Sequence, residues 1–161
     1  MSRASRHNYL IALGCNMRVP GVGPPRAVLL RAIAAMGELG LEVTAVSRLI
    51  ETAPVGPSQR RYANGAAVLD TVLAPPEVLQ ILQGIEQAFG RRRRGQRWRA
   101  RTLDLDIVLW SGGIWVSPDL VIPHPRFRER AFVLGPGAQV AADWRDPVSG
   151  LTLRQLSARA A

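Results

Sequence analysis

The clearest candidates for chemistry are two aspartates, Asp104 and Asp106, which interrupt the apolar run 103–110. If this run is a β-strand, residues two apart lie on one face of the sheet, about 6–7 Å from each other. Both carboxylates would then share a face with Val108 and Trp110, and the opposite face would consist of Leu103, Leu105, Ile107 and Leu109. Neighbouring carboxylates repel each other. Two magnesium ions about 4 Å apart would compensate this repulsion and could bind a transferring phosphoryl group.

A cluster of arginines precedes this run. Seven of them lie in the short stretch before it, namely Arg91, Arg92, Arg93, Arg94, Arg97, Arg99 and Arg101. Guanidinium groups bind phosphate oxygens through parallel hydrogen bonds, so a basic segment leading into two carboxylates suits a complex of metal and polyphosphate. Two alternatives stay open from these residues alone. The aspartates could pair with arginines in a structural network, and the arginines could form a solvated loop or contact RNA.

All 21 positively charged residues are arginines, and the formal net charge is +9. This charge favours an anionic partner such as nucleic acid, an anionic membrane or a polyphosphate, although a general preference for arginine would raise it too. The absence of lysine is more informative about function than the net charge. It excludes a P-loop of the form G-x-x-x-x-G-K-[ST] and the lysine-dependent machinery of protein kinases. Phosphate chemistry in this chain must therefore depend on arginine and metal.

Length and composition are those of a folded, water-soluble domain. The 161 residues fit one domain, 1–161, and a hydrophobic content of 47% is enough to bury a core. No apolar run approaches the roughly 20 residues of a membrane span. The stretch 1–7 is polar and is not followed by the apolar region of a secretory signal. With a single cysteine, Cys15, no internal disulfide can form. We therefore expect a cytoplasmic monomer without a membrane partner.

Two segments have the apolar spacing of amphipathic helices. In the first, 26–39, apolar residues recur at helical intervals and Gly40 supplies a C-terminal stop. The second, 75–90, opens on two prolines and ends at a glycine. Shorter helical pieces are expected near the C-terminus, at 130–133 and 152–159.

Short apolar or alternating runs predict the strands. Four of them lie at 9–13, 41–50, 66–73 and 103–110, and a shorter one follows at 114–116. The resulting order, β-α-β-β-α-β, is the split βαβ arrangement of ferredoxin-like domains. We therefore predict an α+β fold with a ferredoxin-like βαββαβ core, an antiparallel sheet and an appended C-terminal helical segment.

Several motifs together resemble one known family. Gly90-Arg91, Arg93, Arg97-Trp98 and the run 101–106 resemble the signature of the 6-hydroxymethyl-7,8-dihydropterin pyrophosphokinases (HPPKs). The resemblance extends over nearly the whole chain, because further matches follow in the family's order: Gly14-Cys15-Asn16, 51–56, Tyr62-Ala63-Asn64, 121–125 and 130–132. Several separate motifs in the right order are far more specific than any one of them.

Members of this family transfer a diphosphate group from ATP to the pterin and release AMP, in folate biosynthesis. The resemblance implies that Asp104 and Asp106 bind two magnesium ions bridging the ATP phosphates, which Arg91 and Arg101 would also contact. It places three further residues on a mobile loop that closes over the nucleotide: Arg93, Arg97 and Trp98. Nucleotide contacts are also implied for Gln83, Glu86, Ile107, His124 and Arg130. Gln83 and Glu86 are three residues apart and so share a helix face.

The resemblance also implies a pterin site. Tyr62 and Phe132 would stack on the two sides of the ring, and Asn64 would offer its amide-like edge a donor and an acceptor. Thr52 and Val55 would contribute main-chain contacts. The implied partners are thus two small molecules, ATP and hydroxymethyl-dihydropterin, and no nucleic acid.

The sequence departs from the family pattern at a few positions. Arg99-Ala100 replaces a usual Gly-Pro, and Asp119 and Val121 stand where some members carry arginine and threonine. The main rival interpretation is an RNA-binding ferredoxin-like domain, but no strand shows the R-G-F/Y-G/A-F-V-x-F/Y pattern of an RNA-recognition motif. A third interpretation, a catalytically inactive relative, is opposed by the intact acidic, basic and aromatic positions.

Overall fold

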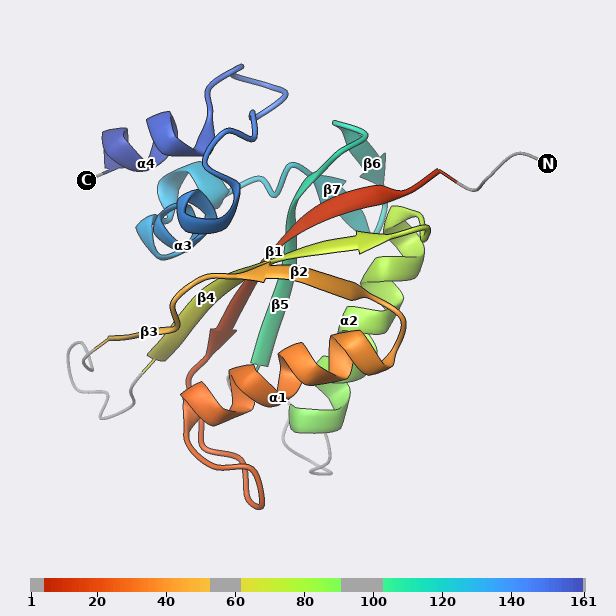
Figure 1. Cartoon of the computed structure of the whole chain (residues 1–161), viewed down its shortest axis with the longest axis vertical. Coiled ribbons are helices and arrows are strands. Elements are labelled where there is room, and N and C mark those ends of the chain that lie inside the picture. Colours follow the sequence, from red (N-terminus) through yellow and green to blue (C-terminus); the bar gives the residue numbers. More distant parts are fainter. Residues whose placement is uncertain (1–4, 53–61, 91–102, 161) are drawn as a thin grey trace.

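A five-stranded antiparallel sheet forms the centre of the computed structural model, which describes residues 5–52, 62–90 and 103–160 (Figure 1). Its strands are β1 (His7–Cys15), β2 (Glu42–Val46), β3 (Ile50–Thr52), β4 (Tyr62–Thr71) and β5 (Leu103–Trp110). The order across the sheet is β2-β4-β1-β5, with β3 paired to the beginning of β4. One helix connects β1 to β2 and another connects β4 to β5. The predicted ferredoxin-like α+β core is therefore confirmed.

One face of the sheet is covered by α1 (Pro25–Glu38) and α2 (Pro75–Gly90). The first packs against β1, β2 and β4, and the second against β5. Buried side chains in α1 follow a helical repeat, with Val28, Ala32 and Met36 all fully buried. Together with apolar residues of the strands these helices close the larger of two hydrophobic cores. Both predicted helices are confirmed to within one residue at each end.

The other face carries the C-terminal part of the chain, which comprises η1 (Phe127–Glu129), α3 (Ala131–Ala141) and α4 (Leu153–Ala160) (Figure 1). The predicted piece 130–133 underestimates α3, because Gly135, Pro136 and Gly137 argue against a helix locally. Tertiary packing overrides that preference: α3 lies on β4 and β1, and Pro136 and Gly137 are buried there. This layer forms a second, smaller core against the sheet.

The pairing of β5 with β1 contains an irregularity that corrects the predicted face pattern. Leu10 pairs with Leu109 but Ile11 pairs with Ile107, so one extra residue, Val108, is inserted in β5. The insertion moves Leu109 into the smaller core beside Val108, and Trp110 packs against the larger core. The predicted common face of Leu109 with Ile107 is therefore wrong. The alternation holds from Leu103 to Ile107, which is the part that carries both aspartates.

The predicted strand 41–50 is in fact two strands. The chain leaves the sheet at Ser47, which is buried. The Ser47 hydroxyl accepts a hydrogen bond from the Ala66 amide at 2.8 Å and donates one to the Arg48 carbonyl at 2.9 Å.

The strand β4 begins four residues before its predicted start, so Tyr62 and Asn64 lie on a strand. A small hairpin of β6 (Trp115–Ser117) and β7 (Leu120–Ile122) follows β5, and its second strand was not predicted.

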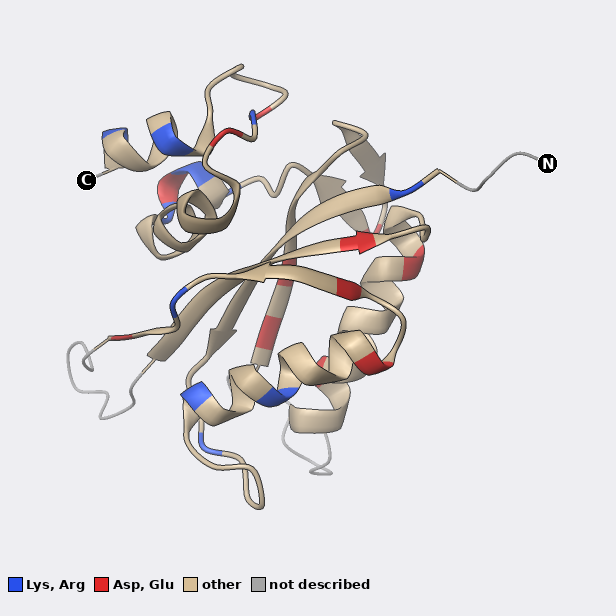
Figure 2. Ribbon diagram, viewed as in Figure 1, with Lys and Arg blue, Asp and Glu red and all other residues tan. Residues whose placement is uncertain are grey.

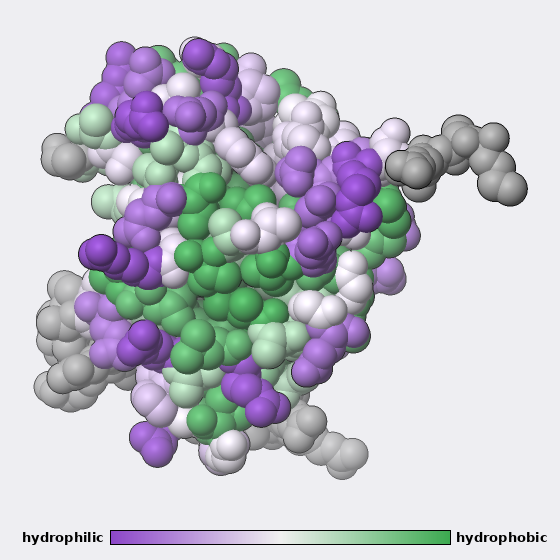
Figure 3. Space-filling model, in the orientation of Figure 1, coloured by the Kyte–Doolittle hydropathy of each residue, from purple (hydrophilic) through white to green (hydrophobic). Residues whose placement is uncertain are grey.

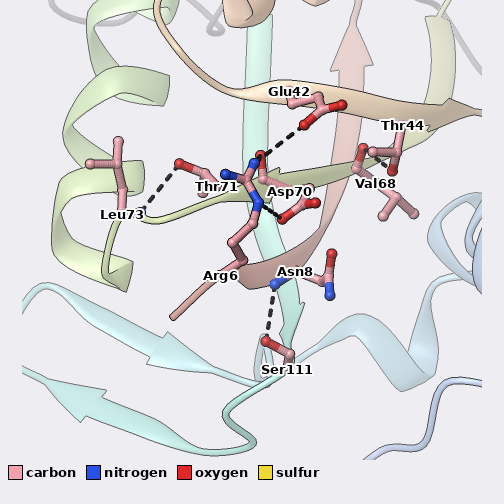
Figure 4. Close-up of polar contacts among 9 residues, drawn as sticks. All are labelled: Arg6, Asn8, Glu42, Thr44, Val68, Asp70, Thr71, Leu73 and Ser111. Atoms are coloured by element: carbon pink, nitrogen blue, oxygen red, sulfur yellow. Dashed lines mark hydrogen bonds and ion pairs between the residues drawn. The ribbon is translucent and has the colours of Figure 1, made fainter. Parts of the chain in front are cut away.

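Polar contacts join neighbouring strands at one end of the sheet (Figure 4). Arg6 donates to Asp70 at 2.9 Å and to Glu42 at 3.2 Å, so it joins the start of β1 to β4 and β2. The Asn8 amide donates to the Ser111 hydroxyl at 3.0 Å. Because the Arg6 ion pairs are largely solvent-exposed, each contributes at most about 1 kcal/mol. They organise the end of β1 that lies opposite to Gly14.

The face in Figure 3 shows apolar side chains gathered over β2 and α1. Both elements carry exposed apolar residues, including Leu30 and Val46. β2 is an edge strand, but it has only five residues and a register irregularity between Val43 and Ala45. Both features limit pairing with a second chain.

Within the described residues no helix is long and apolar enough to cross a bilayer.

Candidate active site

A pocket of about 600 Å³ lies on the sheet face that α3 covers. Its lining residues come from the end of β1, from β3, β4 and β5, and from the start of α3: Ala12, Leu13, Gly14, Cys15, Asn16, Thr52, Tyr62, Asn64, Asp104, Asp106, Arg130, Phe132 and Val133. The split of the predicted second strand and the early start of β4 both bring residues to this place. The pocket therefore draws on five elements that are far apart in sequence.

Small residues on β1 form the floor of the pocket. Gly14 pairs with Asn64 of β4 on one side and with Asp104 of β5 on the other, so these three positions form a row across the sheet. Ala12 likewise pairs with Asp106. A β-carbon at position 14 would lie only 3.3 Å from the Asn64 Oδ1 atom. The absence of a side chain at Gly14 thus leaves space between a carboxamide and a carboxylate.

The two aspartates reach the pocket from the same face of β5, as predicted. Figure 2 marks acidic positions along the β5 ribbon. Asp104 is exposed and Asp106 is half-buried. The described residues contain no cluster of three or more acidic, histidine or cysteine ligands around one point. Two carboxylates that line the same pocket fit magnesium, which prefers oxygen ligands and usually keeps water and substrate phosphates in its coordination sphere.

A third carboxylate supports the strand between the aspartates. Glu86 on α2 is buried, and its Oε2 atom accepts a hydrogen bond from the Leu105 amide at 2.8 Å. Leu105 lies between Asp104 and Asp106, so α2 is joined directly to the backbone that carries both. This contact places the Glu86 carboxylate against the backbone of β5.

His124 lies beside the pocket. Its amide donates to the Val108 carbonyl at 3.1 Å, and its Nδ1 atom accepts from the Arg126 amide at 3.1 Å. Burial lowers the pKa of His124. Asp106 opposes this effect, and Arg130 and Arg126 add to it. The imidazole is therefore neutral at neutral pH, next to one carboxylate and two guanidinium groups.

Two aromatic residues line the mouth of the pocket from different elements. Tyr62 comes from β4 and Phe132 from the first turn of α3, and both rings are about half-exposed. The Arg130 guanidinium lies 5.7 Å from the centre of the Phe132 ring, within the range of a cation–π contact. Exposed aromatic rings at a pocket mouth offer stacking surfaces for a flat ligand.

Most of the predicted site residues that the structure describes meet here. Seven line the pocket: Thr52, Tyr62, Asn64, Asp104, Asp106, Arg130 and Phe132. Gln83 is exposed on α2, and the side chain of Ile107 is buried in the larger core, so a ligand contact at Ile107 would use its main chain. Six predicted residues lie outside the described residues: Val55, Arg91, Arg93, Arg97, Trp98 and Arg101.

Asn16 is a pocket residue to which the sequence analysis gave no role. Its Oδ1 atom is buried and accepts no hydrogen bond from the described residues. Buried carboxamide oxygens are normally hydrogen-bonded, so this acceptor is available to a ligand or to water. The signal in the sequence was the motif Gly14-Cys15-Asn16.

In the same motif burial raises the pKa of the Cys15 thiol. Asp104 adds to the effect, although the Met17 carbonyl opposes it, so Cys15 is not an activated nucleophile.

Comparisons with known proteins point in one direction. The family model described as 7,8-dihydro-6-hydroxymethylpterin-pyrophosphokinase (HPPK) matches residues 10–142. A 2-amino-4-hydroxy-6-hydroxymethyldihydropteridine pyrophosphokinase of Synechocystis is 42% identical over 93% of this chain and 74% of its own length. The protein of the same name from Pseudomonas aeruginosa is 43% identical over 85% of this chain and 82% of its own length.

Solved structures agree at the level of the fold. A Plasmodium falciparum HPPK-DHPS chain, crystallised with pteroate, superimposes with a TM-score of 0.71 at 14% identity. The superposition covers 99% of this chain but only 43% of the Plasmodium chain. At that identity the likeness supports the architecture alone. The match to the family model and the identity to the two bacterial proteins show more: this chain belongs to the 7,8-dihydro-6-hydroxymethylpterin-pyrophosphokinase family.

Proposed function

We propose that this protein transfers a diphosphate group from ATP to 6-hydroxymethyl-7,8-dihydropterin in folate biosynthesis, giving the pterin diphosphate and AMP. Family membership supports the reaction and ATP as co-substrate. One structural observation carries the proposal for this chain: two carboxylates, two carboxamides and two half-exposed aromatic rings line the same pocket of about 600 Å³. This combination suits a metal-bound polyphosphate next to a flat, polar heterocycle.

The pterin would bind on the side of the pocket formed by β3, β4 and the start of α3. Tyr62 and Phe132 would stack on the two faces of the ring, and Asn64 would pair with its amide-like edge. Thr52 and Val55 would add main-chain contacts. Asn16 would accept a hydrogen bond through the Oδ1 atom that is otherwise unpaired among the described residues. These contacts would orient the hydroxymethyl oxygen toward the aspartates.

The triphosphate of ATP would bind on the β5 side. Asp104 and Asp106 would hold two magnesium ions, which when bound neutralise phosphate charge and favour displacement at phosphorus. Arg130 and the neutral His124 would contact the nucleotide, as would Gln83, Glu86 and Ile107. We further propose that Arg91 and Arg101 bind the phosphates, and that Arg93, Arg97 and Trp98 close over the nucleotide.

The reaction would be an in-line attack of the hydroxymethyl oxygen on the β-phosphorus. The new O–P bond forms as the bond from the β-phosphorus to the bridging oxygen breaks, AMP leaves with that oxygen, and the hydroxyl proton is released. Transfer of this kind depends mostly on positioning and on charge neutralisation. The residues of this chain would position the substrates by stacking and hydrogen bonding. Carboxylate-bound metal and guanidinium groups would neutralise the phosphate charge.

Release of AMP tests the proposal. The purified protein, mixed with ATP, magnesium and hydroxymethyl-dihydropterin, should release AMP only when the pterin is present. The double variant Asp104→Ala/Asp106→Ala should lose this activity by a factor of at least about 10³, because both metal-binding carboxylates are removed. Asp143→Ala, which removes an exposed carboxylate elsewhere, should behave like the wild type. Pterin-independent release, or full activity of the double variant, would refute the mechanism.

A further inference from the structure

The C-terminal segment after α3 contains a fully buried carboxylate. The side chain of Asp146 has no exposed surface. It accepts four hydrogen bonds: from Arg128 Nε at 2.5 Å, Arg128 Nη2 at 2.7 Å, the Ser149 hydroxyl at 2.7 Å and the Val148 amide at 3.0 Å. A buried carboxylate is costly unless all its lone pairs are satisfied. Here the fork of one guanidinium supplies two of the four donors.

Arg128 fixes the short turn η1 to this segment. Its guanidinium lies 4.6 Å from the centre of the Phe127 ring, which is itself buried in the smaller core. The side chain of Arg128 therefore lies between an aromatic ring of η1 and a carboxylate 18 residues further along the chain. A bidentate pair of this kind fixes orientation as well as distance.

Backbone hydrogen bonds connect η1 to both sides of the pocket wall. Upstream, the Phe127 amide donates to the His124 carbonyl at 3.3 Å. Downstream, the Arg130 amide donates to the Phe127 carbonyl at 3.2 Å, and the Leu134 amide donates to the Arg130 carbonyl at 2.9 Å. The stretch 124–134 is thus one hydrogen-bonded unit. It contributes Arg130, Phe132 and Val133 to the pocket lining.

The pair is suited to positioning more than to stabilisation. A buried ion pair often stabilises a fold no more than apolar residues of the same volume would, but it allows far fewer arrangements of the groups it joins. Asp146 follows the stretch 10–142 that matches the family model. Asp146 does not line the pocket, but Arg128 joins it to the segment that forms the pocket wall. The C-terminal segment therefore positions this wall in addition to covering the sheet.

We infer that Arg128 and Asp146 are positioning residues, whose buried ion pair sets the place of the wall formed by His124, Arg130 and Phe132 for both substrates. This inference rests on the proposed function. Neither residue of the pair lines the pocket. The pair acts through η1, so that weakening it shifts the wall while the aspartates on β5 and the floor on β1 stay in place.

The test compares Asp146→Asn with the wild type in steady-state AMP release. Asn keeps the shape of the side chain but lacks the charge that the Arg128 fork requires. The KM values for pterin and for ATP should both rise about tenfold, since displacements of about 1 Å in binding groups have effects of this size or larger. Thermal melting and titration of active sites, done in parallel, exclude a loss of folded protein as the cause.

Two further variants complete the design. Arg128→Lys keeps the charge but loses the fork, so its KM values should lie between those of the wild type and Asp146→Asn. Asp143→Asn removes an exposed pair with Arg154 at 3.3 Å in the same segment, and it should leave both KM values unchanged.

The inference fails if folded Asp146→Asn has both KM values within twofold of the wild type and only its melting temperature falls, because that is the signature of a purely structural role. If Asp146→Asn does not fold, Arg128→Lys decides by the same criterion. A wild-type protein that releases no AMP with pterin would contradict the proposed function instead, so the two failures are distinguishable.

Discussion

At the scale of single residues, the pocket depends as much on what is missing from its floor as on the side chains around it. Gly14 lies between Asn64 and Asp104 in the sheet, and its lack of a side chain keeps the carboxamide and the carboxylate accessible from one space. The backbone at Gly14 is ordinary extended strand, so any residue could adopt its conformation. The glycine is required for space and not for backbone freedom.

This requirement predicts the effect of Gly14→Ala. The new methyl group would lie 3.3 Å from Asn64 Oδ1 and push the carboxamide away from the pterin edge. The KM for pterin should rise about fivefold, which corresponds to roughly 1 kcal/mol, while the KM for ATP changes less. Gly37→Ala is the matched control, since a β-carbon on that exposed glycine of α1 meets no atom within 4 Å. Equal KM values for Gly14→Ala and the wild type would contradict this role.

At the scale of elements, sequence patterns predicted those helices and strands that local interactions determine. The spacing of apolar residues located α1, α2 and β5 almost to the residue, because those elements bury one continuous face. The full length of α3 could not be predicted, since Pro136 and its flanking glycines argue against a helix and only packing on β4 and β1 overrides them. The insertion of Val108 in β5 also depends on pairing with β1, which no property of β5 alone reveals.

The contact between α2 and β5 gives a prediction at the same scale. Glu86→Leu removes the acceptor of the Leu105 amide and should lower the free energy of unfolding by about 1–3 kcal/mol. It should also lower kcat, because Leu105 lies between Asp104 and Asp106. Urea unfolding and AMP release measure the two effects.

Glu86→Gln and Gln87→Leu serve as controls for this contact. The first keeps an acceptor for the amide and should retain most of the stability. The second changes an exposed position on the same helix and should alter stability by less than about 0.5 kcal/mol. If Glu86→Leu proves as stable as the wild type, the contact does not support β5.

At the scale of the whole molecule, the two faces of the sheet have different roles. The face under α1 and α2 holds the larger core, and the opposite face holds both the smaller core and the pocket. The motifs predicted most pocket residues because the family resemblance joined segments that are distant in sequence. They gave no sign of the pair between Arg128 and Asp146, since an arginine and an aspartate 18 residues apart form no recognisable pattern. The single domain 1–161, the monomeric state and the cytoplasmic location stay predictions.

The same pair predicts how global stability depends on pH. Burial raises the pKa of Asp146, but hydrogen bonds from Arg128, Ser149 and Val148 outweigh burial and hold the pKa well below its ordinary value. A carboxyl group with a depressed folded-state pKa stabilises the fold above its ordinary pKa of about 3.9, and this contribution is lost as the pH falls below that value. Acid should therefore weaken the attachment of the C-terminal segment.

Unfolding measurements at two pH values test this dependence. At pH 7 Asp146→Asn should be less stable than the wild type by about 3–5 kcal/mol, because removing one partner leaves the other charge uncompensated. Near pH 3 the wild type should lose about 1 kcal/mol of this advantage, because the carboxyl group is then mostly protonated in the unfolded chain while it stays ionised in the fold. A difference between the two proteins that stays constant from pH 7 to pH 3 would mean that the carboxylate of Asp146 is not the stabilising species.

Transfer of the diphosphate in one step can be observed by following each phosphate of ATP. ATP labelled separately at the α, β and γ positions is incubated with magnesium, hydroxymethyl-dihydropterin and the protein, and the products are separated. We expect the α label in AMP, and the β and γ labels together, in equal amounts, in the pterin product. Transfer of the γ label alone with formation of ADP, or release of both labels as free phosphate, would contradict one-step transfer of the diphosphate.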